Sequence, residues 1–427
     1  MAKTYDTYKD SGIAWIGNIP SEWEIKKLGN FYTQRNEKVS DKDFSPLSVT
    51  MQGILPQLET AAKTNDGDNR KLVRVGDFAI NSRSDRRGSC GISPYDGSVS
   101  LINTVLCPKD KMNAKFYNWL FHTTMFADEY YKWGHGIVDD LWTTRWSEMK
   151  NISVVEPPLS EQQAIATYLD EKCGEIDSLI SLQEEMISEL QAYKQSVITE
   201  AVSKGLDPNV PMKDSGVEWI GMIPEAWDIK RIKFIANIWG RIGFRGYKGE
   251  DLNKEGIGAI TLSPSNMKSF YMDYSSVTYL SWEKYNESPE IMIQNGDILF
   301  VKTGSSYGKA CYVENLPREA TINPQILRIV PKNNQKFLCY FLQTPYIKFE
   351  TECGVVGGTI PTISQEKIRN MYVISPPISE QQAIASYLDE KTSQIDSLIA
   401  LKQEKITELK DYKKSIIYEY VTGKKKV

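Results

Sequence analysis

The sequence predicts an α+β fold in which two mixed α/β domains are separated by two long helices packed as an antiparallel coiled coil, with a pseudo-two-fold internal repeat. Three observations predict it: two motifs occur twice, a heptad-like pattern follows one of them in both copies, and the stretches between the motifs combine strand and helix signals. We therefore expect a first domain at 1–159, a helix at 160–205, a second domain at 206–378 and a second helix at 379–427.

Two pairs of near-identical segments carry the repeat. The entry motif, KDSGIAWIGNIPSEWEIKKL at 9–28, matches KDSGVEWIGMIPEAWDIKRI at 213–232 at 12 of 20 positions. The helix motif, SEQQAIATYLDEK at 160–172, matches SEQQAIASYLDEK at 379–391 at 12 of 13 positions. The inserts between these motifs are far less alike. Constant motifs around divergent inserts suggest two modules that perform one task on different targets, and drift after duplication is the alternative.

A long helix is expected to begin at each helix motif. Ser160 and Ser379 are suited to cap the helix, and an acidic residue follows each of them in the first turn. Apolar residues then recur at heptad spacing, namely Leu169, Cys173, Ile176, Ile180, Ile187, Leu190 and Val197, and Leu388, Ile395, Ile399, Ile406, Leu409, Ile416 and Tyr420. Polar residues interrupt both series, at Gln183 and Lys194 and at Lys402 and Lys413. We expect the two helices to pack on each other; two separate coiled coils with other chains are the alternative.

The inserts are expected to combine strands and helices. Apolar runs at 297–301 and 326–330 are typical of strands, and aromatic-rich stretches at 115–133 and 336–353 are typical of helices. Four tryptophans of the entry motifs recur in both copies, which favours a packing role: Trp15, Trp23, Trp219 and Trp227.

Composition excludes several classes of protein. No run of about 18 apolar residues exists and the first residues lack a signal-peptide core, so we expect a cytoplasmic chain. Six cysteines without a CxxC pair and only two histidines argue against a metal site or a histidine-based triad. The net charge is −4, but residues 160–205 hold nine acidic and three basic residues, which leaves the remainder near neutral. A basic surface can therefore still be assembled by folding.

Catalytic motifs do not fit this sequence. GSSYGK at 304–309 has three residues between its glycines and lacks the hydroxyl after Lys309 that a phosphate-binding loop uses for Mg²⁺. The Pro-Pro pairs at 157–158 and 376–377 are followed by Leu159 and Ile378, which cannot stack a flipped base as an aromatic residue would. We therefore expect no catalytic residue and no metal in this chain.

Loops rich in Arg, Lys, Gly and small hydroxyls are the candidate binding surfaces. Arg contacts guanine with two hydrogen bonds, Lys and Ser contact phosphates, and glycine lets the backbone approach closely. The candidate DNA-binding residues are Arg83, Ser84, Arg86 and Arg87 in the first insert, and Arg241, Arg245, Tyr247, Lys248, Lys302, Thr303, Ser305, Ser306, Tyr307 and Lys309 in the second. Ordinary solvated loops are the alternative for each stretch taken alone.

Two motifs, each present twice, also carry a family resemblance. They are Trp-Ile-Gly-x-Ile-Pro-x-x-Trp at 15–23 and 219–227, and Pro-Pro-(Leu/Ile)-Ser-Glu-Gln-Gln-Ala-Ile-Ala at 157–166 and 376–385. With them, essentially the whole chain resembles the specificity subunits of Type I restriction-modification enzymes. The divergent inserts do not allow the base-contacting residues of that family to be carried over.

The resemblance implies that 1–159 and 206–378 are target-recognition domains, each of which reads one half of a split DNA sequence, and that the helices are spacers. It implies double-stranded DNA, two methyltransferase subunits that modify adenine N6, and motor-nuclease subunits as partners. No cofactor is implied in this chain; S-adenosylmethionine, ATP and Mg²⁺ are expected in the partner subunits. A stand-alone DNA methyltransferase or nuclease, and a coiled-coil scaffold that binds no nucleic acid, are the alternatives.

Overall fold

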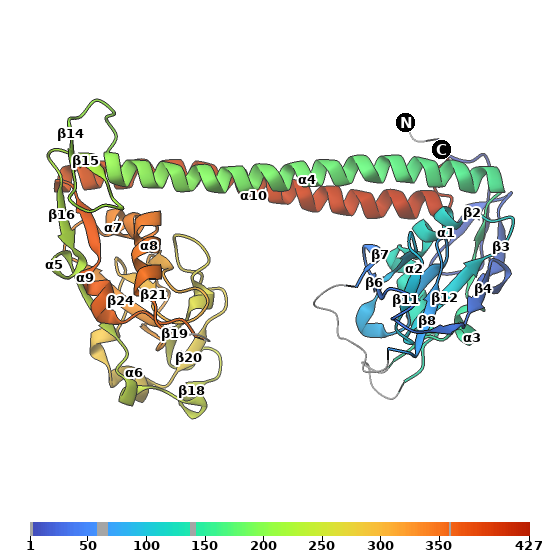
Figure 1. The fold of residues 1–427 in the computed structure, drawn as a ribbon, viewed down its shortest axis with the longest axis horizontal. Coiled ribbons are helices and arrows are strands. Elements are labelled where there is room, and N and C mark those ends of the chain that lie inside the picture. Colours follow the sequence, from blue (N-terminus) through green and yellow to red (C-terminus); the bar gives the residue numbers. More distant parts are fainter. Residues whose placement is uncertain (1–2, 58–66, 137–141, 358–359) are drawn as a thin grey trace. The chain divides into compact units, whose positions relative to one another are not determined.

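The computed structural model describes residues 3–57, 67–136, 142–357 and 360–427 and divides into two compact units. The first unit comprises Met1–Glu185 and Lys402–Val427, and the second comprises Met186–Leu401. Each unit holds a mixed α/β module with one half of α4 (Leu159–Lys204) and one half of α10 (Ile378–Val421) (Figure 1). The boundaries expected at 159, 205 and 378 for separate domains stay a prediction.

In its described residues, the module of the first unit consists of short strands and three short α-helices. Its four-stranded sheet has the order β10-β9-β12-β4, and its three-stranded sheet has the order β11-β8-β5. The bounds are β1 Tyr8–Asp10, β2 Asn18–Pro20, β3 Glu24–Lys27, β4 Tyr32–Arg35, β5 Lys38–Val39, β6 Leu47–Thr50, β7 Gly53–Pro56, β8 Arg70–Val73, β9 Phe78–Asn81, β10 Cys90–Ile92, β11 Gly97–Val99, β12 Asn103–Pro108, β13 Ser153–Glu156, α1 Ala114–Phe121, α2 Thr124–Lys132 and α3 Trp146–Met149.

The module of the second unit repeats this plan with a different second sheet. Its first four-stranded sheet has the order β17-β24-β21-β22, and its second has the order β18-β20-β19-β23. The bounds are β14 Met212–Asp214, β15 Met222–Pro224, β16 Asp228–Arg231, β17 Ala236–Gly240, β18 Leu252–Asn253, β19 Ala259–Leu262, β20 Thr278–Leu280, β21 Ile298–Val301, β22 Ala310–Tyr312, β23 Ala320–Ile322, β24 Ile326–Pro331, β25 Tyr372–Ser375, α5 Ile232–Ile235, α6 Trp282–Asn286, α7 Gln335–Leu342, α8 Pro345–Gly354 and α9 Gln365–Asn370.

The main sheet of each unit has a central strand that is buried on both faces. In β21, Ile298 and Phe300 belong to the hydrophobic core that includes α7, whereas Leu299 and Val301 belong to the core shared with β19 and β23. Alternate residues of a strand point to opposite faces, so one strand serves two cores. The expected strands at 297–301 and 326–330 are therefore confirmed as β21 and β24.

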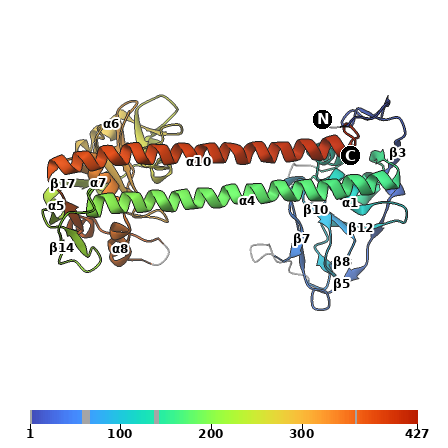
Figure 2. The same ribbon diagram turned by 90° about the horizontal axis from the view of Figure 1, so that it is seen from above.

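The two long helices pack antiparallel in each unit, as the heptads predict (Figure 2). In the first unit, Asp177 pairs with Lys413 at 2.6 Å and Gln183 accepts from Lys402 at 3.4 Å, so the residue numbers of the two helices run in opposite directions. In the second unit, Lys194 pairs with Asp396 at 2.6 Å. The polar interruptions of the heptads thus form cross-helix pairs, and the mixed α/β fold with paired long helices is confirmed. Among the described helices, none is long and apolar enough to cross a membrane.

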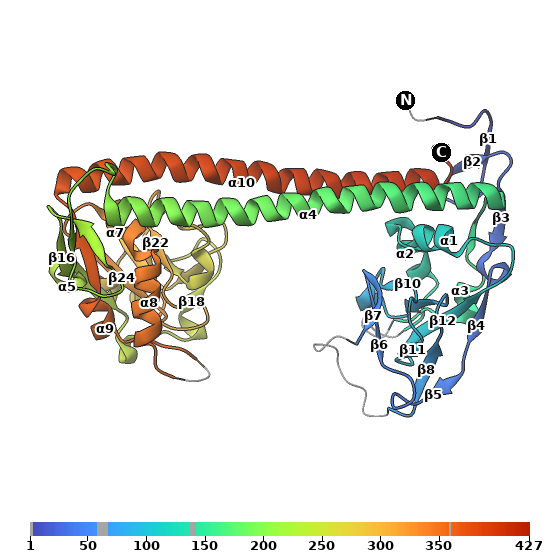
Figure 3. The same cartoon turned by 45° about the horizontal axis from the view of Figure 1, so that its top comes forward.

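The helices expected in the aromatic-rich stretches are confirmed, and each stretch forms two of them. In the first unit, Thr123 caps α2 by accepting a hydrogen bond from the Phe126 backbone N–H, which ends α1 before it. In the second unit, Pro345 begins α8, because proline lacks the N–H that would continue α7. In the first unit, α1 packs along the N-terminal half of α4, where Lys115 and Trp119 both donate to Asp170 (Figure 3).

The entry motif is bound to the helix motif in both units. The Trp23 indole donates to the Glu161 carboxylate at 2.9 Å, and the Trp227 indole donates to Glu380 at 2.8 Å. Both indoles are fully buried. The carboxylates lie in the first turn of a long helix, where free backbone N–H groups favour negative charge. Each bond therefore fixes the start of a module against the start of the helix that follows it.

The end of each long helix packs on the same tryptophan. Gly205, at a φ of +82°, follows α4, and a Cβ there would lie 3.2 Å from the Trp227 ring. Gly423, at a φ of +71°, follows α10, and a Cβ there would lie 2.3 Å from Pro20 and 3.1 Å from the Trp23 ring. The positive φ favours glycine at both helix ends, and at Gly423 the close approach to Pro20 also requires it.

Replacing the buried Trp227 with alanine is expected to destabilise the second unit by about 3–5 kcal/mol, because a large side chain and its hydrogen bond to Glu380 are lost. Trp219→Ala, at a position that is 37% exposed, is the matched control with an expected loss of about 1 kcal/mol. Urea unfolding followed by circular dichroism measures both. Equal shifts of the unfolding midpoint would contradict the anchoring role of Trp227.

Candidate nucleic-acid interface

The two candidate loops lie at equivalent places in the two units. The first follows β9, and the second follows β21, the strand at the same position of the repeated sheet order. Each loop pairs with a segment that precedes a short helix: Arg83 bridges to Thr143 before α3, and Thr303 bridges to Thr362 before α9. The same backbone bond supports both, from Thr144 N–H to the Ser82 carbonyl at 3.0 Å and from Ile363 N–H to the Lys302 carbonyl at 2.9 Å.

The loop of the first unit presents two exposed guanidinium groups. Arg86 is 67% exposed and lies 3.6 Å from the Asp85 carboxylate. Arg87 pairs with Asp128 and lies over the ring of Tyr131, with its Cζ atom 5.3 Å from the ring centroid. Arg83 is partly buried at the start of the turn, and the side chain of Ser84 is outside the described part of the structure. Exposed ion pairs of this kind are weak and can exchange for phosphate at little cost.

The stretch 241–248 divides into an internal part and an exposed part. Arg241 is buried, and its guanidinium donates to the Ile322 carbonyl at 3.1 Å, to the Thr321 hydroxyl at 3.0 Å and to the Arg245 carbonyl at 3.3 Å. Burial lowers the pKa of Arg241. The Tyr247 ring lies beneath this guanidinium, at 5.3 Å. The bonds of Arg241 thus serve the fold, and we leave it out of the proposed contact surface.

The exposed part of that stretch is basic. Lys248 is 82% exposed and lies 3.7 Å from Glu250. Arg245 is 37% exposed and pairs with Glu290 at 3.5 Å. Lys302, on the other candidate loop, lies 3.9 Å from the position that a Cβ on Gly240 would occupy, so it approaches the residue before that stretch. Burial lowers the pKa of Lys302.

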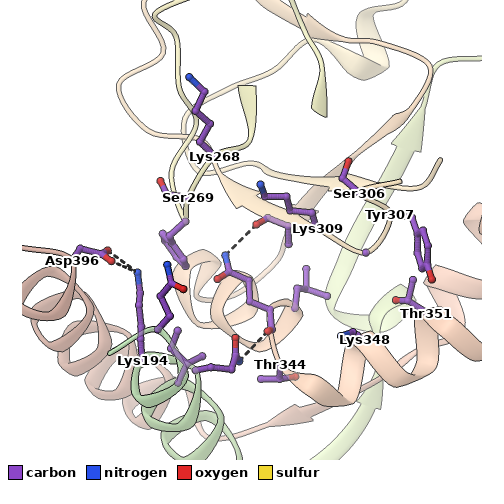
Figure 4. Close-up of a pocket in the computed structure, with 18 of the residues that line it drawn as sticks. Lys194, Lys268, Ser269, Ser306, Tyr307, Lys309, Thr344, Lys348, Thr351 and Asp396 are labelled. Carbon is purple, nitrogen blue, oxygen red and sulfur yellow. Dashed lines mark hydrogen bonds and ion pairs between the residues drawn. The ribbon is translucent and has the colours of Figure 1, made fainter. Parts of the chain in front are cut away.

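Residues 305–309 line a groove of about 710 Å³ within the second unit. The other walls come from the C-terminal half of α4, the α10 residues Asp396 and Ile399, the segment 268–270, and residues of α7 and α8 (Figure 4). Ser305, Ser306, Tyr307 and Lys309 therefore share one wall, whereas Thr303 lies at the bridge to Thr362.

Lysines predominate among the charged residues of this groove. Lys194 is neutralised by Asp396. Lys268 is 68% exposed and pairs with Asp273, which does not line the groove. Lys348 is 77% exposed and lies 3.9 Å from Glu352. Lys309 forms no ion pair with any residue that the structure describes. Flexible ammonium groups on an open groove are suited to phosphate oxygens.

A second hollow, of about 560 Å³, lies in the first unit beside the Arg83–Thr143 bridge. It is lined by Gln34, Asn36, Lys71, Ser82, Leu101, Ile102, Thr104, Thr143, Arg145, Trp146, Ser147 and Lys150. No local sequence motif marks this hollow, because its lining comes from four strands or their ends and from α3. Only the loop at 81–88 gave a local signal of binding in this unit.

Metal-binding geometry is missing from the part of the chain that the structure describes. No group of three or more His, Cys, Asp or Glu side chains gathers there as a metal site would require. Burial raises the pKa of the Cys90 thiol to about 12, and that of the Cys311 thiol likewise to about 12, so neither is an activated nucleophile.

Arg241→Ala is expected to lower the free energy of unfolding by about 2–4 kcal/mol, since it leaves the Thr321 hydroxyl and the Ile322 carbonyl without their donor. Lys248→Ala, at an exposed position, should change it by less than about 0.5 kcal/mol. Thermal unfolding of both variants checks this. A stable Arg241→Ala protein that had lost only DNA affinity would show that Arg241 contacts DNA after all.

Comparison with known proteins finds a family domain in part of the chain and similar proteins over most of it. Residues 224–411 match the Type I restriction modification DNA specificity domain. The chain is similar to the Type I restriction enzyme MjaVIII specificity subunit of Methanocaldococcus jannaschii, with 23% identity across 96% of this chain and 94% of the relative. It is also similar to the EcoKI specificity subunit of Escherichia coli K12, with 22% identity across 64% of this chain and 57% of the relative.

A solved structure has the same fold over almost the whole chain. It was solved to explain complex assembly and conformational transition of the type I R-M system. It matches with a TM-score of 0.70 and 15% identity, and the match covers 94% of this chain and 98% of that chain. The family model matches the second unit from Pro224 onward and α10 as far as Asp411, and the relative from Methanocaldococcus jannaschii extends the likeness to the first unit. The chain is thus similar over almost its whole length to a specificity subunit of a Type I restriction enzyme, and part of it matches the DNA specificity domain.

Proposed function

We propose that this chain is the DNA sequence-recognition subunit of a Type I restriction-modification complex and contributes no catalytic residue of its own. Each module reads one half of an asymmetric, interrupted DNA target, and the long helices set the distance between the halves and bind the methyltransferase subunits. Two methyltransferase subunits and the motor-nuclease subunits are the proposed partners, and the cytoplasm is the proposed compartment. S-adenosylmethionine, ATP and Mg²⁺ belong to those partners in this proposal.

The observation that carries the proposal is that one sheet order supports two chemically different loops. β10-β9-β12-β4 and β22-β21-β24-β17 have the same order, and the loops after β9 and β21 are held by the same bridge. Arg86 and Arg87 lie on one loop, whereas hydroxyls and Lys309 lie on the other. Different side chains on equivalent supports are suited to different base sequences, because bases are distinguished by donor and acceptor patterns in the major groove.

The length of the helices supports the spacer role. α4 has 46 residues and α10 has 44, which corresponds to about 65–70 Å at 1.5 Å per residue. Equivalent faces of B-DNA recur about every 34 Å. A pair of such helices is long enough to separate two reading modules by a turn of DNA, so that base pairs between the half-sites go unread.

Exposed apolar residues on the helices support the binding of partner subunits. Leu179 and Leu182 of α4 are 47% and 49% exposed, and their counterparts 219 residues later, Leu398 and Leu401 of α10, are 48% and 62% exposed. These side chains remain exposed although the two long helices are packed on each other, so that packing does not bury them. Exposed apolar groups of this kind mark interaction sites. Two equivalent pairs fit two copies of one subunit.

Single-molecule methylation mapping of DNA from cells that co-express the chain with its methyltransferase tests the proposal. The expected result is adenine methylation at a sequence of two unlike halves separated by unspecified bases. Methylation at a contiguous palindrome would contradict two different modules. S-adenosylmethionine binding or Mg²⁺-dependent cleavage by the purified chain alone would favour a stand-alone enzyme, and an assembled complex without duplex preference would favour a scaffold.

The helix surface is tested by the double variants Leu179→Ser/Leu182→Ser and Leu398→Ser/Leu401→Ser. Each is expected to reduce the complex from two methyltransferase subunits per chain to one, as measured by native mass spectrometry, because each removes one exposed apolar pair. Lys405→Ser/Glu408→Ser, which removes an exposed ion pair on α10, is the control and should retain two subunits. Two subunits bound to the fourfold leucine variant would contradict this assignment.

A further inference from the structure

The hollow of the first unit has a floor of strands and a rim formed around α3. Gln34 lies on β4, Thr104 lies on β12 and Lys71 lies on β8, while Arg145 and Lys150 flank α3. Thr143, on the same wall, bridges to Arg83, so the hollow adjoins the exposed loop that carries Arg86 and Arg87. The loop and the hollow therefore form one continuous surface of the first module.

The charge of this hollow is positive. Among the described residues that line it, three are cations and none is a carboxylate. Arg145 and Lys150 are exposed, and Glu148 directs its carboxylate to the Arg145 backbone N–H at 3.1 Å to cap α3. Lys71 is partly buried and donates to the Asn103 carbonyl at 2.7 Å, so it holds the floor together and is not a free contact.

The polar floor holds a paired amide. The Asn36 side-chain NH₂ donates to the Gln34 side-chain oxygen at 3.1 Å. Among the described residues, the other two polar groups of these amides, the Gln34 NH₂ group and the Asn36 side-chain oxygen, have no hydrogen-bond partner. The bond between the two amides therefore leaves one donor group and one acceptor oxygen for a ligand. Adenine presents the complementary pair in the major groove, an acceptor at N7 and a donor at N6.

We propose that this hollow contacts base edges in the half-site bound by the first module, with the Gln34–Asn36 amide pair on an adenine and with Arg145 and Lys150 on flanking phosphates. The inference rests on the proposed function and assigns residues outside the loops. Neutral amides distinguish bases through their hydrogen-bond pattern, whereas the exposed cations fix the position of the backbone. The two groups therefore have separable effects on specificity and on affinity.

The experiment uses the full chain assembled with its methyltransferase subunits. Fluorescence anisotropy measures the affinity for the mapped target and for duplexes changed at single positions, over a series of salt concentrations. Gln34→Ala/Asn36→Ala is expected to lose about 10- to 100-fold of discrimination at one adenine position in one half-site. The other half-site should be unaffected. Gln34→Glu, which keeps the size of the side chain, should weaken the preference for adenine, since a carboxylate accepts from cytosine N4 instead.

Arg145→Ala/Lys150→Ala should weaken binding to all duplexes alike and reduce the slope of log affinity against log salt by about 2, because each phosphate contact contributes about 0.9. Lys115→Ala/Lys132→Ala removes two cations of α1 and α2 that are 65% and 68% exposed and lie outside the hollow. This control should leave the slope unchanged. Thermal unfolding confirms that each variant is folded.

The outcomes separate this inference from the function on which it rests. A wild-type complex that methylates an interrupted site, with an unchanged sequence preference in both Gln34 variants, would overturn the role of the hollow and leave the proposed function standing. A wild-type complex with no interrupted target would overturn both. Loss of preference at one position of one half-site supports the assignment.

Discussion

The structure depends on one hydrogen bond that occurs twice, from a buried tryptophan of the entry motif to a glutamate in the first turn of a long helix. Trp23 with Glu161, and Trp227 with Glu380, join segments that are more than 130 residues apart. The glycine after the other long helix packs on the same indole, so the module start, the helix start and the helix end meet at one residue. Because this junction fixes both ends of each insert, the residues in between are free to differ.

The two units differ in the arginine that pairs with an equivalent buried aspartate. Asp77 and Asp297 precede equivalent strands, but Asp77 pairs with Arg35 of β4 at 2.7 Å, whereas Asp297 pairs with Arg328 of β24 at 2.6 Å. A buried carboxylate needs a charged partner, and either strand can supply it. The scaffold therefore constrains the chemistry of a position more than its sequence, which is what the proposed recognition of two different targets requires.

The sequence predicted the repeat and the long helices well, because heptad spacing over six turns or more is a strong periodic signal and the motifs recur nearly unchanged. It carries no signal where the outcome depends on distant partners. Arg241 in a glycine-rich run resembles a surface contact, and only the fold brings Thr321 and Ile322 to it. The hollow of the first unit escaped notice because Gln34 and Arg145 are remote in sequence. The helix break at Pro345 did carry a local signal, the proline itself.

The central claim is that two interchangeable modules on one scaffold read two independent half-sites. The most direct test replaces residues 24–156, from the start of β3 to the end of β13, with residues 228–375, from the start of β16 to the end of β25, since these strand pairs are equivalent. Because α4 and α10 run antiparallel, methylation mapping of the assembled complex should reveal an interrupted site whose halves are inverted copies of the half read by the second module. Methylation of the original asymmetric site, or of a contiguous sequence, would contradict the account.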